Sequence, residues 1–182
     1  MQIFPGLSGP QGNSSLTIFV VNDYRGGVAG RLQQEIKQTK AIRLLEEETT
    51  LNIVRTADVL MLALMDTLKP YALSATQYNV LRILRGAGEA GASCKQIGSR
   101  MVTRDPDITR LMDRLEKRGL LTRDRAKEDR RVVTHRLTAA GLELVNEMDR
   151  PIEAVHRKLM RHMKPGRLRE LIGLLEEVRS GL

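Results

Sequence analysis

Aromatic residues and cysteine are scarce in this sequence of 182 residues. Phe, Tyr and Trp together make up 3% of it, Trp is absent, and there is a single cysteine. One cysteine excludes an intramolecular disulfide and favours a reducing, cytoplasmic setting. With so few aromatics, the core is expected to consist of Leu, Ile, Val, Met and Ala side chains on helices.

Long apolar segments and the usual signatures of enzymes are also missing. The apolar run Leu16–Val21, which has Thr17 inside it, is far shorter than the roughly 20 residues that span a bilayer, and no basic segment precedes it as in a signal peptide. No HExxH or CxxC spacing, nucleophile elbow, phosphate loop or pair of catalytic carboxylates stands out. We therefore expect no membrane span, no enzymatic activity, no catalytic residue, no metal and no cofactor.

Positive charge is what the sequence has in excess. Its formal net charge is +8 and its isoelectric point is about 10.1. Clustered Lys and Arg gain affinity for a polyanion by releasing its condensed counterions. Nucleic acid is the first candidate for that partner, and an anionic membrane surface is the second.

The beginning of the chain differs in composition from the rest. Residues 1–30 are rich in Gly, Pro, Ser and Asn and show no helical period. We expect residues 1–40 to form a flexible extension. Alternatively, translation begins nearer Val28 or Leu32 through a non-AUG codon, which an N-terminal mass measurement of the native protein would reveal.

Helical periodicity begins near Ala41. Apolar residues between Leu44 and Leu68 recur at spacings of three and four, which predicts one long amphipathic helix that ends at Lys69-Pro70. Acidic residues 46–48 suit the positive end of its dipole.

Two capping boxes follow. Ser74–Gln77 predicts a second helix that stops at Gly86 and Gly88, and Ser93–Gln96 predicts a short third helix over Cys94–Met101. Asp105-Pro106 then reads as an N-cap with Pro at the first helical position, which predicts a fourth helix over Asp105–Arg118.

A strand pair comes next. Leu120–Arg123 and Val132–Leu137 have the pattern of two strands, and they enclose the almost wholly charged stretch Asp124–Arg131, which cannot enter a core. The remainder reads as a helical region from Thr138 to about Met163, kinked or broken at Pro151, and a last helix over Arg167–Arg179.

This order predicts a fold that is mainly α with a small β-hairpin wing, a winged helix-turn-helix with a helical dimerisation region. Such a lobe places its second helix in the major groove of DNA and its hairpin on backbone or minor groove. Residues 92–138 hold 13 Lys and Arg against 7 Asp and Glu, about +6 of the chain's +8. A single charged patch could simply be solvated, but the conjunction of capped helices and basic hairpin favours DNA.

Blocks of this sequence also resemble the MarR family of transcription regulators. They are Leu73–Leu81, Asp107–Leu120, Asp129–Arg131 and Leu137–Gly141, in the family's order, and the resemblance covers roughly residues 40–180. It implies a homodimer that binds a pseudo-palindromic DNA operator, usually as a repressor, and that often releases DNA when a small phenolic or lipophilic effector binds. Residues 41–70 and 138–182 would then be dimerisation helices, and residues 74–137 the winged helix-turn-helix.

Carried over residue by residue, the resemblance names two groups of DNA-binding positions. The first lies on the recognition helix, where Arg is the best candidate for guanine or phosphate. Its members are Asp107, Thr109, Arg110 and Arg114. The second lies on the wing, where Arg131 would enter or skirt the minor groove, Asp129 would hold its guanidinium and the others would contact phosphate. Its members are Arg125, Lys127, Asp129, Arg130 and Arg131.

Asp107 is unusual on a DNA face, because a carboxylate repels phosphate. It could accept backbone N–H groups in the first helical turn, or it could contact a cytosine amino group.

Some residues have two interpretations. Cys94 stands where a helix N-terminus would lower a thiol pKa and permit redox sensing, but we favour a small packing residue. Met61, Met65, Met112 and Met148, with Tyr71 and Tyr78, could line an effector pocket between the dimer helices and the lobe, although methionine on an apolar stripe is more often core.

The terminal helices have more apolar positions than a lone lobe can cover, which predicts that they bury them against a second copy. The alternative function is a non-specific architectural nucleic-acid-binding protein without a ligand response. Competition with unrelated duplex DNA distinguishes the two.

Overall fold

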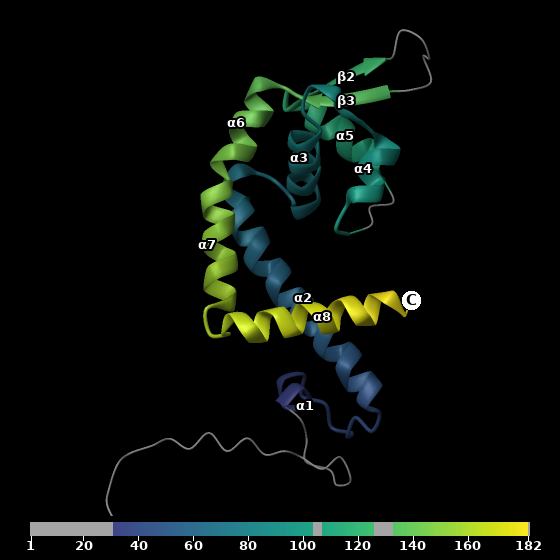
Figure 1. Ribbon diagram of the computed structural model, residues 1–182, viewed down its shortest axis with the longest axis vertical. Helices are drawn as coiled ribbons and strands as arrows, with labels where there is room; N and C mark the ends of the chain where they lie inside the picture. Colours follow the sequence, from purple (N-terminus) through teal and green to yellow (C-terminus); the bar gives the residue numbers. More distant parts are fainter. Residues whose placement is uncertain (1–30, 104–106, 126–132, 182) are drawn as a thin grey trace, which may run out of the picture. The chain divides into compact units, whose positions relative to one another are not determined.

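The structure is a computed structural model that describes residues 31–103, 107–125 and 133–181. These residues are mostly helical, with one small antiparallel sheet (Figure 1). The elements, in chain order, are α1 (Arg31–Glu35), α2 (Leu45–Leu68), η1 (Lys69–Tyr71), α3 (Ala75–Ala87), η2 (Gly88–Ala90), β1 (Ala92–Ser93), α4 (Cys94–Arg100), α5 (Ile108–Lys117), β2 (Leu121–Arg125), β3 (Val133–Leu137), α6 (Ala139–Glu147), α7 (Asp149–Met160) and α8 (Pro165–Ser180).

Contacts divide the chain into two compact units, Met1–Asn52 and Ile53–Leu182. The first contains α1, a helix of five residues that the sequence pattern did not predict, and the beginning of α2. Residues 1–30, most of the predicted extension, lie outside the described part of the chain. The second unit contains the remaining elements, and everything below concerns that unit unless stated.

The long first helix of the prediction is confirmed as α2, although it begins at Leu45 rather than near Ala41. Three glutamates occupy its first turn, where the helix dipole favours negative charge. It ends where expected, because Pro70 has no N–H to donate and the chain passes into the 3-10 turn η1.

Both predicted capping boxes are present. In α3 the Gln77 N–H donates to Ser74 Oγ over 3.1 Å, and the Ser74 N–H donates to Gln77 Oε1 over 3.0 Å. Ser93 and Gln96 make the same reciprocal pair at the start of α4, at 3.3 and 2.8 Å. Two of the orphan backbone donors at each helix start are thereby satisfied.

The sheet has the order β1-β3-β2, and both pairings are antiparallel. The predicted pair is confirmed, with the register running from Leu121 opposite Leu137 to Arg125 opposite Val133. The first strand extends two residues further than predicted, because Asp124 and Arg125, assigned to the charged stretch, still pair with β3. The sequence pattern missed β1, which is only two residues long and runs directly into the cap of α4. Gly91, just before β1, has φ +66°, and a Cβ there would lie 2.5 Å from the carbonyl oxygen of His135.

One apolar core joins these elements. Figure 1 shows α3, α4 and α5 gathered beside the strands, and α3 contacts β3 and α6 while α5 contacts β2. The core's fully buried large side chains include Leu81 and Leu84 of α3, Ile97 of α4, Met112 and Leu115 of α5, Leu121 of β2, and Val145 of α6.

The helical region after the sheet is broken where Pro151 predicted. α6 starts at the Thr138 cap, whose Oγ1 accepts the Gly141 N–H over 3.0 Å, and it ends at Glu147. Pro151 lies in the first turn of α7, so the N–H that would continue α6 through to α7 is missing. The last predicted helix is confirmed as α8, which starts two residues earlier than expected, at Pro165.

The predicted fold class, mainly α with a small β-hairpin, is therefore confirmed within the described residues.

Candidate nucleic-acid interface

α5 presents one face to the core and the other to solvent. Leu111, Met112 and Leu115 are buried. Thr109, Arg110 and Arg114 are exposed, and so is Asp107 directly before the helix. The four positions suggested for the recognition helix therefore lie on the solvent side of a helix that the core holds in place.

The beginning of α5 differs from the prediction. The helix starts at Ile108, and its N-cap is Asp107, whose Oδ1 accepts the Arg110 N–H over 3.4 Å. The prediction had placed the cap at Asp105, which lies with Pro106 outside the described residues. A carboxylate three residues before the receiving N–H satisfies the same requirement, so the sequence offered two equivalent caps.

Asp107 also forms an ion pair with Arg110. Its Oδ2 lies 3.2 Å from Arg110 Nε. Of the two roles suggested for this carboxylate, the cap of the helix is the one that the structure confirms. The ion pair in addition fixes the direction of the Arg110 guanidinium and partly neutralises it.

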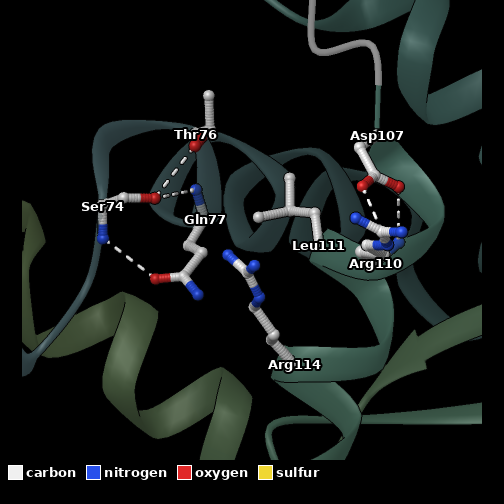
Figure 2. A pocket seen from close by; sticks show the side chains of 7 residues that line it. All are labelled: Ser74, Thr76, Gln77, Asp107, Arg110, Leu111 and Arg114. Atoms are coloured by element: carbon white, nitrogen blue, oxygen red, sulfur yellow. Dashed lines mark hydrogen bonds and ion pairs between the residues drawn. The ribbon is translucent and has the colours of Figure 1, made fainter.

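Arg114 faces a different environment. A polar hollow of about 340 Å³ separates α5 from the first turn of α3, and its walls are Ser74, Thr76, Gln77, Asp107, Arg110, Leu111 and Arg114. Figure 2 shows the Arg114 side chain extending toward Gln77, whereas Arg110 turns back toward Asp107. Oγ1 of Thr76 and Oγ of Ser74 lie 2.9 Å apart beside it. The hollow thus combines two arginines, two hydroxyls and the positive end of α3 with one carboxylate, that of Asp107, which is paired with Arg110. This leaves Arg114 and the start of α3 to attract an anion.

Two further contacts set the angle of the helix pair. At the end of α5, Arg118 donates from Nη1 to the carbonyl of Ala72 over 2.7 Å and from Nη2 to that of Tyr71 over 3.1 Å. In the turn between α4 and α5, the Val102 N–H donates to Asn79 Oδ1 of α3 over 2.9 Å. Neither residue was expected to act in this way, because these contacts join positions 23 and 46 to 47 residues apart and leave no local pattern.

The wing is described only at its base. Arg125 is the last residue of β2, and its side chain lies outside the description, as do Lys127, Asp129, Arg130 and Arg131. The base itself is braced by ion pairs, Arg123 with Asp113 of α5 at 3.4 Å and Arg136 with Asp124 across the two strands. The strands that carry the predicted tip are thus fixed to the recognition helix.

His135, in the middle strand, is completely buried. Within the described residues neither of its ring nitrogens has a hydrogen-bond partner. Burial lowers the pKa of His135, and the nearby Arg123 guanidinium acts in the same direction. The ring is therefore a neutral, desolvated member of the sheet's inner face.

Cys94 corrects a prediction. The helix start was expected to lower the pKa of its thiol, but burial is the larger effect and raises that pKa. The side chain packs, half-buried, against the core, which agrees with the packing interpretation.

The residues suggested for an effector pocket are mostly core. Tyr78, Met112 and Met148 are buried in the cluster around α3, and Tyr71 packs against it. Met61 is half-buried, and Met65 lines a hollow of about 410 Å³ between the end of α2 and the start of α3. Methionine on an apolar stripe thus acted as a packing residue in two of four cases.

No helix in the described residues is long and apolar enough to cross a membrane.

Comparisons with known proteins agree on one family. The model of the MarR family matches residues 73–133, which include the capped helices α3 and α4, α5, β2 and the first residue of β3. The HTH-type transcriptional regulator YkoM of Bacillus subtilis, itself uncharacterised, is 30% identical over 110 residues, which are 60% of this chain and 70% of the relative.

Solved structures have the same fold over about three quarters of this chain. A MarR transcription factor from Planctomyces limnophilus is 40% identical, covers 74% of this chain and 98% of its own, and superposes with a TM-score of 0.58. BpsR of Bordetella bronchiseptica, in a structure that concerns regulation of its DNA binding by 6-hydroxynicotinic acid, is 23% identical and has a TM-score of 0.65 over 72% of this chain and 98% of its own. The fold is a winged helix-turn-helix, and this chain belongs to the MarR family of transcription regulators.

Proposed function

We propose that this protein is a sequence-specific DNA-binding repressor, that it acts as a homodimer on a pseudo-palindromic operator, and that a small effector lowers its affinity for that operator. The observation that carries the proposal is the exposed face of α5, where Thr109, Arg110 and Arg114 project from a helix whose other face is locked into the core.

Arg110 and Arg114 have different roles in this proposal. Asp107 holds Nε of Arg110, which leaves the two terminal NH₂ groups of a fixed guanidinium for O6 and N7 of a guanine. Arg114 extends into the hollow beside Ser74 and Thr76, where it contacts a backbone phosphate together with the first turn of α3. Thr109 completes the base-facing edge of the helix.

The wing completes the interface. Arg131 enters or skirts the minor groove with Asp129 orienting it, and Arg125, Lys127 and Arg130 contact phosphates. Support comes from the base of the wing, which an ion pair between Arg123 and Asp113 joins to α5. Arg131→Ala is expected to weaken operator binding by about tenfold, roughly 1.4 kcal/mol, without unfolding the protein.

The first experiment identifies the operator. DNA fragments selected by the purified protein are sequenced, and binding to the selected site is then competed with unrelated duplex. Specific regulators prefer their site by about 10³-fold or more at physiological salt. Equal affinity for both duplexes would favour the architectural alternative.

The second experiment separates phosphate from base contacts. Each operator phosphate is replaced in turn by an uncharged methylphosphonate, and affinity is measured for the wild type, Arg114→Gln and Arg110→Gln. We expect one phosphate at which the wild type and Arg110→Gln lose affinity while Arg114→Gln, already weakened, does not. Arg110→Gln should instead relax preference at one base pair. Sensitivity of Arg114→Gln equal to that of the wild type at every phosphate would contradict this division.

The dimer accounts for the apolar residues that the chain leaves in solvent. No residue of α8 is buried, and Ile172, Leu174 and Val178 are 54%, 54% and 48% exposed. On α2 the large side chains of Val54, Val59 and Leu62 are exposed as well. A second copy would bury these apolar faces against its own identical faces. The resulting dimer would hold two recognition helices about 34 Å apart. The molar mass of the protein, measured by light scattering as it elutes from a size-exclusion column, tests whether it is a dimer.

The effector is proposed to be a small phenolic or lipophilic compound. The proposal is supported by the family resemblance and by BpsR, whose DNA binding is regulated by 6-hydroxynicotinic acid. The two DNA-binding lobes of a dimer can lie at different distances from each other. An effector lowers operator affinity if it binds more tightly to a dimer whose lobe distance does not match the operator. Operator titrations with and without candidate compounds measure this directly.

A further inference from the structure

A second concentration of positive charge lies outside the helix-turn-helix lobe, where α7 turns into α8. Residues 156–169, which we call the basic corner, contain six Lys and Arg and no Asp or Glu. Outside this corner and the lobe segment 92–138, the chain has 11 Lys and Arg against 15 Asp and Glu. The excess of positive charge is therefore confined to two segments, and the lobe is only one of them.

Every charged side chain of the basic corner is exposed. Arg157 pairs with Glu153 and Arg167 pairs with Glu170. The other four basic residues form no ion pair with any residue that the structure describes, and they are Lys158, Arg161, Lys164 and Arg169. The larger apolar side chains among them are half-buried, namely Leu159, Met160, Met163 and Leu168. The corner thus presents cations to solvent without a large exposed apolar side chain.

The stability of the helices explains only part of this arrangement. Arg157 and Lys158 lie in the last turn of α7, where the helix dipole favours cations. Lys164 is the N-cap residue of α8 and Arg167 lies in its first turn, where the dipole disfavours them, and no acidic residue lies in that turn. Cations gathered against the dipole and against one another destabilise the fold, so we infer that an external anion balances them.

The basic corner lies at the end of α7 that is farther from the sheet (Figure 1). α6 and α7 contain 9 and 12 residues, and at about 1.5 Å per residue they separate the corner from the base of the wing by about 30 Å. A duplex that lies against α5 and the wing is beyond the reach of Lys and Arg side chains at the corner. The corner is therefore available to a different partner.

These features favour the phosphate backbone of a second DNA duplex as that partner. Four of the six cations are Arg, whose planar guanidinium matches phosphate oxygens in pairs. A helix that binds a membrane surface combines basic residues with exposed apolar side chains that enter the lipid, and residues 156–169 expose no large apolar side chain. Duplex DNA requires no such side chains, because release of its counterions supplies the affinity.

We propose that the basic corner is a second DNA-binding surface, independent of sequence, with which a molecule bound to its operator through the lobe holds another duplex segment. In a dimer the corner is present twice, which doubles the phosphate contacts available to that segment. The bridging of two duplexes rests on the proposed function; binding of a duplex by the corner does not.

The test is a capture experiment with the full chain. Operator duplex on beads is loaded with protein, and a labelled duplex of unrelated sequence is added at physiological salt. We expect the wild type to capture the second duplex. A corner variant that combines Arg161→Gln, Lys164→Gln and Arg169→Gln should bind it at least about fivefold more weakly, although both proteins load equally on the beads. Loss of three phosphate contacts should also reduce the slope of log affinity against log salt by about 2.7.

A control variant separates the position of the charges from their number. Lys37→Gln, Lys40→Gln and Arg43→Gln together remove the same charge from exposed residues outside both basic segments. This variant should capture the second duplex as the wild type does. Circular dichroism melting verifies that each variant is folded. Equal capture by the wild type and the corner variant, or an equal loss in the control variant, would overturn the inference.

Two measurements test other partners of the corner. Sedimentation with phosphatidylglycerol vesicles tests a membrane, and the molar mass of the corner variant tests a contact between two copies. Binding to vesicles that depends on the corner, without capture of DNA, or a corner variant that is monomeric where the wild type is dimeric, would overturn the inference.

A direct titration with unrelated duplex keeps the inference separate from the proposed function. If the wild type binds no operator, this titration of the wild type and the corner variant replaces the capture step. Weaker binding by the corner variant would then support the corner and contradict the proposed function alone. Equal binding by the two proteins would overturn the inference.

Discussion

The helix-turn-helix lobe and the C-terminal helix α8 use the same apolar residues in opposite ways. Leu115 of α5 is 0% exposed, whereas Leu174 of α8 is 54% exposed, although both belong to stripes with helical spacing. The periodicity of a stripe indicates that it will be covered, but not which molecule covers it. In the lobe the cover is the chain itself, and for α8 we propose that it is a second copy.

Two glycines provide the test of this comparison with the largest expected effect. A Cβ at Gly141, in the first turn of α6, would lie 1.9 Å from the carbonyl oxygen of Leu120, whereas nothing lies within 4 Å of a Cβ at Gly166 of α8. Gly141→Ala must therefore push α6 away from the sheet, and we expect a loss of about 3 kcal/mol or more in the free energy of unfolding, measured by urea titration.

Gly166→Ala is the matched control for that substitution. It adds the same methyl group in open space near a helix start, so its effect should stay within about 1 kcal/mol. Equal losses in the two variants would mean that the contact between α6 and the residue before β2 is not tight.

The dimer hypothesis predicts the next largest effect. Ile172→Glu places a charge on the exposed stripe of α8, where a partner would have to desolvate it. We expect the dimer to weaken by about thirtyfold or more, roughly 2 kcal/mol, in analytical ultracentrifugation, while the monomer keeps its helical content. Glu176→Gln, which changes charge on the polar side of the same helix, should leave the dimer intact. A fully dimeric Ile172→Glu protein would place the interface elsewhere.

His135 yields a smaller effect that depends on pH. Its pKa is lowered in the folded chain, so below about pH 6.5 the unfolded chain takes up a proton that the folded chain does not. Stability is therefore full above that pH and falls as the solution becomes more acidic, by at most about 1.4 kcal/mol per pH unit from this group. Unfolding curves between pH 7.5 and 5 should show this loss in the wild type and a smaller one in His135→Leu. An identical dependence of unfolding free energy on pH in the two proteins would show that His135 does not cause the loss.

Much of the lobe could be predicted because its signals are local. The boxes Ser74–Gln77 and Ser93–Gln96 and the break near Pro151 each depend on residues within a turn of one another, and the structure has all of them. The predicted N-cap of α5 was two residues too early, because Asp105 and Asp107 are both acceptable caps and only the folded turn selects one.

Contacts between distant segments could not be predicted. Arg118 bonding the carbonyls of Tyr71 and Ala72, Asn79 holding the turn before α5, and Arg85 bridging to Asp149 all depend on the packing of α3 against later helices. The prediction of a lowered pKa for Cys94 was wrong for the same reason. Burial of the thiol raises its pKa by more than the local helix start lowers it.

Cys94 provides the smallest effect. Its raised pKa keeps the thiol protonated near neutral pH, and the protonated thiol is a poor nucleophile. Alkylation by iodoacetamide at pH 7.5 should be about tenfold slower in the folded protein than in the urea-unfolded chain, and Cys94→Ala should cost about 1 kcal/mol or less. Operator affinity should be the same before and after brief treatment with hydrogen peroxide. A loss of affinity that Cys94→Ala prevents would instead revive the oxidant-sensing interpretation, and it would mean that the packed lobe opens often enough to expose a residue that its core covers.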